Sequence, residues 1–123
     1  LTVVAAAQAG ASEYFSEHVK DFGTTPRGPV LTHYFTITNT SKNTITLGQP
    51  RVSCGCVSAS LLKNTLAPGE KTAVVAYMDT RRIPTAGVLK SVIVFVPFLS
   101  PTAEEVQLRV QTIARDDLVI SPD

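Results

Sequence analysis

Alternation between apolar and polar side chains is the feature that most limits what this chain can fold into. In residues 105–113, Val106, Leu108 and Val110 alternate with polar residues, as in a β-strand with one buried face and one wet face. Residues 30–38 alternate in the same way. No window shows apolar residues recurring every three and four positions for more than about two helical turns. The sequence therefore predicts an all-β chain.

Turn-forming residues divide the chain into about seven short segments with strand character. The expected strands are residues 13–20, 30–38, 44–47, 51–58, 71–78, 88–96 and 105–113. We expect turns at residues 21–29 and 97–101, which are rich in glycine or proline. Short strands at this spacing are typical of an immunoglobulin-like (Ig-like) antiparallel β-sandwich of about seven strands.

The chain length and its ends indicate one exported domain. A chain of 123 residues fits a single domain. We expect residues 1–12 to be a signal-peptide remnant or N-terminal arm, residues 13–115 the sandwich, and residues 116–123 a tail or the start of a further repeat. Ala7-Gln8-Ala9 has the form of a signal-peptidase site, so the expected location is the periplasm, the cell surface or outside the cell. No run of about 18 apolar residues is present, so no transmembrane segment is expected.

Charge and residue placement exclude several functional classes. Eleven basic and ten acidic residues give a net charge of +1, and no window gathers the stripe of Lys and Arg that phosphate binding needs, so nucleic acid is not an expected partner. No pair of acids suggests general acid-base work, and no Ser, His and Asp set resembles a triad. We expect a non-enzyme whose partners are proteins, in a homo-oligomer or a larger envelope assembly.

Cys54 and Cys56 are the chain's two cysteines and its main candidate for chemistry. Two residues apart in an expected strand, they would face the same side. They are interpreted as buried thiols, a local disulfide whose small ring Gly55 relieves, a redox-exchange pair, or a source of an intermolecular bond; the local pair is favoured. A soft copper(I) or zinc site is a further alternative, with His33 and Met78 as added ligands. Apart from that alternative, no cofactor is expected.

Residues 88–96 are apolar on both faces of the expected strand. Ile93 and Phe95 point away from the side that carries the neighbouring valines, so both sides should be covered. The chain's own loop or arm covers the second side, or this side is an interface. Residues 1–6, with Leu1, Val3 and Val4 as interface candidates, have the composition of a strand donated to a neighbour.

Five short strings in order, within residues 14–115, resemble the bacterial domain-of-unknown-function family fifteen-seventy-three (DUF1573). They are Lys20-Asp21-Phe22-Gly23-Thr24, His33-Tyr34-Phe35 through Asn39-Thr40, Ser53-Cys54-Gly55-Cys56, Ala67-Pro68-Gly69-Glu70 and Met78-Asp79-Thr80. The resemblance implies an Ig-like sandwich related to the Hydin and major-sperm-protein types, found in exported bacterial proteins and without an established enzymatic activity. Val57 and Leu61-Leu62 stand where family members often carry Thr and Trp.

Two functions follow from these observations. The first is a non-enzymatic, exported structural or protein-interaction module of the bacterial envelope that self-assembles by strand addition. The alternative is a small metal-binding or redox module that uses Cys54 and Cys56.

Overall fold

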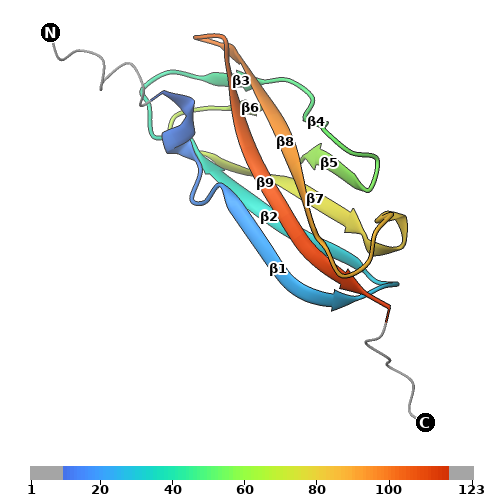
Figure 1. Cartoon of the computed structure of the whole chain (residues 1–123). Helices are drawn as coiled ribbons and strands as arrows, with labels where there is room; N and C mark the ends of the chain where they lie inside the picture. The colour runs from blue at the N-terminus through green and yellow to red at the C-terminus, as the bar shows by residue number, and fades with distance from the viewer. Residues whose placement is uncertain (1–9, 117–123) are drawn as a thin grey trace, which may run out of the picture.

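The computed structural model describes residues 10–116 and shows two β-sheets packed face to face (Figure 1). The six-stranded sheet has the order β1-β9-β8-β3-β6, with β4 also paired to β8, and the three-stranded sheet has the order β2-β7-β5. The elements are η1 (Ala11–Tyr14), β1 (Val19–Pro26), β2 (Val30–Thr38), β3 (Ile45–Leu47), β4 (Arg51–Val52), β5 (Val57–Leu61), β6 (Thr65–Leu66), β7 (Lys71–Asp79), η2 (Thr80–Arg82), β8 (Leu89–Ser100) and β9 (Glu104–Arg115). The predicted β-sandwich is confirmed. This part of the chain has nine strands and not seven, because residues 51–58 contribute to two strands, β4 and β5, and because β6 was not expected.

The core lies between the two sheets and is filled by alternate residues of their strands. Val92, Val94 and Val96 of β8 are fully buried, as are Phe35 and Ile37 of β2. Burying each such side chain stabilises the fold by about 1.5–3 kcal/mol before the entropy of ordering is subtracted. The predicted inner faces of these strands are therefore confirmed.

The expected strand at residues 13–20 and most of the expected turn at 21–29 are wrong, since only residues 27–29 form the turn before β2. The 3₁₀ helix η1 occupies Ala11–Tyr14, and β1 begins at Val19 and continues to Pro26. Gly23 has a φ of 75°, its N–H donates to Asp21 Oδ1 at 2.8 Å, and the pairing register shifts between Asp21 and Thr24. Residues that usually form turns thus make a β-bulge in an edge strand.

The expectation of a fully antiparallel sandwich needs one correction. β1 pairs with β9 in parallel, with Val19 opposite Arg109. The connection between these strands contains the rest of the domain, and no local sequence pattern reports such a pairing. The other strand pairs of the described chain are antiparallel.

The predicted break at residues 97–101 is also wrong, because β8 continues through Pro97 to Ser100. Pro97 lies opposite Glu105 of β9, and its carbonyl accepts a hydrogen bond from the Gly48 N–H at 2.9 Å. The N and C=O of one strand residue point to the same neighbour. The missing N–H of Pro97 therefore faces the Gly48 side, and the ladder between β8 and β9 is not interrupted.

The expected continuous strand at residues 51–58 is instead a crossover between the two sheets. β4 pairs with β8 in the six-stranded sheet, and β5 pairs with β7 in the three-stranded sheet. Residues 53–56 connect them across the side of the sandwich (Figure 1). The two cysteines therefore lie in this crossover turn and not on one face of a regular strand.

Hydrogen bonds fix both ends of the crossover turn. The Ser53 N–H donates to the Ile93 carbonyl at 3.0 Å, and the Ile93 N–H donates to Ser53 Oγ at 3.0 Å. At the other end, the Asp79 N–H donates to the Cys56 carbonyl at 2.8 Å. The turn is thus held to β8 before the cysteines and to β7 after them.

A buried asparagine organises the loop after β2. Asn39 is fully buried, and its Nδ2 donates to the carbonyls of Asn43 and Leu66 at 2.8 and 2.9 Å. Its Oδ1 accepts from the N–H and Oγ of Ser41 at 2.9 and 2.6 Å. One side chain therefore replaces the regular pairing that this loop lacks.

We predict that Asn39→Ala lowers the free energy of unfolding by about 2–4 kcal/mol, because two carbonyls and the Ser41 donors lose a buried partner. Urea denaturation followed by circular dichroism measures this loss. Asn43→Ala, in the same loop but exposed, is the control and should change stability by less than about 0.5 kcal/mol. Equal losses in both variants would contradict the role of Asn39.

Gly55 in the crossover turn should tolerate a side chain. It is not among the glycines with positive φ, and an added Cβ would meet no atom within 4 Å. We predict that Gly55→Ala leaves stability unchanged or raises it by about 0.4–1 kcal/mol by restricting the unfolded chain. The measurement is urea denaturation under reducing conditions.

The matched control for this prediction is Gly69→Ala. Gly69 also has open space around an added Cβ, but its φ is +88°, so alanine there should cost about 1–2 kcal/mol. A larger loss at Gly55 than at Gly69 would show that residue 55 needs the freedom of glycine.

Candidate functional site

The crossover turn brings the two cysteine sulfurs together. Cys54 Sγ and Cys56 Sγ are 2.7 Å apart, and both residues are free cysteines. The Val57 N–H donates to the Cys54 carbonyl at 3.2 Å, which closes a tight turn around Gly55. Cys56 is only 3% exposed and belongs to the core, whereas Cys54 is half-buried. One sulfur is therefore accessible and the other is shielded.

The surroundings of the two thiols shift their pKa values in opposite directions. The pKa of Cys54 is lowered mainly by the hydrogen bond from the Cys56 thiol, and further by the Cys56 N–H, which is 3.3 Å from Cys54 Sγ, and by Lys90 of β8. Burial and the neighbouring Cys54 raise the pKa of Cys56 to about 11. Cys54 is therefore the thiol that ionises first as pH rises.

Of the other proposed ligands, His33 has a different partner, whereas Met78 lies in the same buried core cluster as Cys56. His33 Nε2 lies 3.0 Å from Glu17 Oε1, and the His33 ring stands edge-on to Phe35 with centroids 4.8 Å apart. Met78 is fully buried on β7, opposite Val57. Within residues 10–116, no group of three or more His, Cys, Asp or Glu residues could hold a metal ion. The soft pair at the turn thus has no third ligand of these types.

The second candidate site is the outer face of the six-stranded sheet. Ile93 and Phe95 of β8 point to this face and are half-buried. The Arg51 guanidinium lies 4.9 Å from the centre of the Phe95 ring and forms an ion pair with Glu105. The Arg51 side chain of β4 therefore covers Phe95 in part, whereas the expected cover was a loop or the terminal arm.

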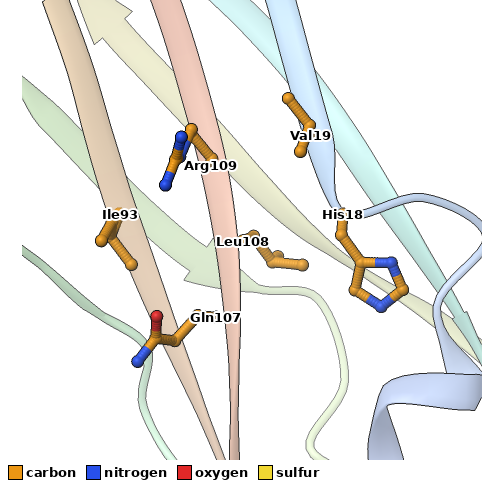
Figure 2. Close-up of a pocket in the computed structure, with 6 residues that line it drawn as sticks. All are labelled: His18, Val19, Ile93, Gln107, Leu108 and Arg109. Atoms are coloured by element: carbon orange, nitrogen blue, oxygen red, sulfur yellow. The ribbon is translucent and has the colours of Figure 1, made fainter.

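A shallow hollow of about 350 Å³ lies next to this covered part. The register of β1, β9 and β8 puts Val19, Arg109 and Ile93 in one row across the sheet. Figure 2 shows the lining side chains, which come from the start of β1 and from β8 and β9. They are His18, Val19, Ile93, Gln107, Leu108 and Arg109. Sequence reasoning found Ile93 alone of these, because the hollow depends on the parallel pairing of β1 with β9.

The interface candidates Leu1, Val3 and Val4 lie outside the described residues, as do residues 117–123. The described chain begins at Gly10, and the Ala11 N–H donates to Glu104 Oε1 at 3.1 Å. Ala11 is 2% exposed and belongs to the core. No helix in the part of the chain that the structure describes is long and apolar enough to cross a membrane.

Solved structures with this fold include proteins of different kinds. The chain is 15% identical to a protein of unknown function from Porphyromonas gingivalis W83, with a TM-score of 0.69 over 79% of this chain and 44% of that one. For the VesB protease of Vibrio cholerae the identity is 20% and the TM-score 0.61, over 85% of this chain and 33% of the protease. For the CupB2 chaperone of Pseudomonas aeruginosa the identity is 12% and the TM-score 0.56, over 86% of this chain and 57% of the chaperone.

These likenesses show the fold, and the chain spans less than two thirds of each of the three proteins. No curated protein matches the chain. The model of one protein family matches residues 14–112, which confirms the resemblance carried by the Ser-Cys-Gly-Cys turn and the other strings. The chain belongs to that family, which is described as "Protein of unknown function (DUF1573)".

Proposed function

We propose that the chain is a non-enzymatic, exported protein-interaction module of the bacterial envelope. It binds another protein on the outer face of its six-stranded sheet, over the hollow between β1, β9 and β8. The observation that carries the proposal is an apolar row on the outer side of β8 beside the charged group of Arg109.

The outer side of β8 differs from what a solvated face requires. Ile93, Phe95, Pro97 and Leu99 follow one another on this side, and Leu99 is 56% exposed. The paired strand β9 presents polar side chains on the same face, as an antiparallel sheet facing water normally does. Such a contiguous apolar row on one strand supports an interaction surface.

Charge indicates what kind of partner fits the hollow. Arg51 is paired with Glu105 and lies over Phe95. Arg109 is exposed and lies between Val19 and Ile93 on the sheet. The ion pairs found in residues 10–116 do not include Arg109. A protein surface that offers an apolar side chain next to a carboxylate complements this arrangement.

Export is part of the proposal and is supported by the sequence. Ala7-Gln8-Ala9 has the form of a signal-peptidase site, and the family resemblance implies exported bacterial proteins. The occurrence of this fold in a chaperone supports a binding role, although the fold also occurs in a protease.

Site-specific photo-crosslinking tests the proposed surface. A photo-reactive residue at the exposed Gln107, at the rim of the hollow, should capture a partner protein in cells, whereas one at the exposed Lys71, in β7 of the three-stranded sheet, should not. With that partner purified, Ile93→Asp and Arg109→Glu should each weaken binding about 10-fold or more. Lys71→Glu, the control, should change the affinity less than about 2-fold. Equal capture from both positions, or binding that all three variants retain, would contradict the proposal.

Self-assembly by strand donation is a second candidate function, supported by the outer edge of β2, which the chain's own Phe15 and Ser16 cover only at Thr36 and Ile37. This nine-residue strand ends the three-stranded sheet and exposes Val30 and Tyr34. Such an edge accepts an added strand, and residues 1–6, with Leu1, Val3 and Val4, have a suitable composition.

Deletion of residues 1–9 should convert an oligomer into a monomer if the arm is donated, as measured by light scattering during size-exclusion chromatography. Thr32→Pro should have the same effect. The Thr36 carbonyl faces the outer edge of β2, where it accepts from the Ser16 N–H, and by alternation the Thr32 N–H faces the uncovered part of the same edge. A truncated chain that keeps the oligomeric mass would exclude arm donation.

A further inference from the structure

The crossover turn holds more chemistry than a binding module needs. Its two sulfurs are 2.7 Å apart, and the hydrogen bonds of Ser53 and of the Cys56 carbonyl fix the main chain on either side. The fold of the main chain therefore places the two sulfurs within bonding reach of each other. This feature is independent of the proposed binding face.

The two cysteines are unequal in a way that suits a two-step exchange. Cys54 is partly accessible, and no atom lies within 4 Å of an added Cβ on Gly55, so the turn is open at its tip. Cys56 is 3% exposed and packs in the core. An accessible thiol beside a shielded one is the arrangement of an attacking and a resolving cysteine.

Hydrogen bonding and burial favour the same division of roles. The thiol and N–H of Cys56, and to a smaller extent Lys90, lower the pKa of Cys54, and burial raises the pKa of Cys56. The thiolate is the attacking species in thiol–disulfide exchange. Lys90 and Cys56 are the titratable groups that act on Cys54.

From this geometry we infer that the chain exchanges thiols for a disulfide with a disulfide-bonded protein, with Cys54 as the attacking sulfur and Cys56 as the resolving sulfur. The Cys54 thiolate attacks one sulfur of the partner's disulfide. The Cys54–partner bond forms, the partner's S–S bond breaks, and its second sulfur leaves as a thiolate that takes a proton from water.

The second step completes the exchange. Cys56 gives its proton to water and attacks Cys54 Sγ, so that the Cys54–Cys56 bond forms and the partner's remaining sulfur leaves as a thiolate. Two electrons pass from the chain's two thiols to the partner's disulfide. A Cys-Gly-Cys bond closes a small ring, and strained disulfides are readily reduced, so the reaction also runs in reverse with a dithiol.

Wild-type protein gives the first test without any variant. With less than one equivalent of iodoacetamide at neutral pH, peptide mapping should find Cys54 alkylated about 10-fold or more in excess of Cys56. Lys90→Gln should slow alkylation of Cys54 about 3-fold, whereas Lys42→Gln, at an exposed position in a loop, should not. Equal labelling of the two cysteines would overturn the assignment of their roles.

Oxidised glutathione is the probe for the exchange itself. After acid quenching, the mass of the reduced wild-type chain should fall by two hydrogens with no glutathione retained. Cys56→Ser should accumulate one mixed disulfide with glutathione. Cys54→Ser should react with oxidised glutathione at about one tenth of the wild-type rate or more slowly. Circular dichroism confirms that the variants are folded. Stable glutathione on the wild-type chain, or a purified chain whose sulfurs hold zinc or copper until a chelator is added, would overturn the inference.

Discussion

The two-sided pairing of β8 is the constraint on which the rest of this sandwich depends. One edge of the strand pairs with β9 along most of its length, and the other edge pairs first with β4 and then with β3. Its inner side chains Val92, Val94 and Val96 are completely buried against the opposite sheet. A strand fixed in this way leaves only its outer side chains free. Both candidate sites are built against it.

The short partners of β8 explain why the cysteines are found in a turn. β4 ends at Val52 after only two residues, because the chain must reach β7 in the other sheet to begin β5 at Val57. The connection has four residues, 53–56, and small residues suit so short a path. Gly55 is compatible with it without a left-handed conformation. Its lack of a side chain therefore affects access to the neighbouring sulfurs more than it affects the backbone.

The sequence predicts the fold class and the inner faces of the long strands, since both follow from a two-residue period that burial imposes. It does not predict where Pro97 and Gly23 are tolerated. That depends on which neighbour a missing N–H faces and on whether an edge strand can bulge, and both are set by residues distant in sequence.

The same limit applies to the candidate sites. The spacing of the cysteines indicated a pair, but not the crossover that makes one sulfur accessible and the other buried. The row of Val19, Arg109 and Ile93 exists only because β1 pairs with β9 in parallel.

Ile93 shows how one strand residue can serve two sites without conflict. Its N–H and carbonyl point sideways, in the plane of the sheet, and hold Ser53 at the start of the crossover turn. Its side chain points outward and lines the hollow. Because main-chain and side-chain directions are perpendicular in a strand, a substitution of the Ile93 side chain leaves the hydrogen bonds to Ser53 available. The position of the sulfurs therefore depends on the backbone of β8, whereas binding at the outer face depends on its side chains, and experiments on one site can be interpreted without disturbing the other.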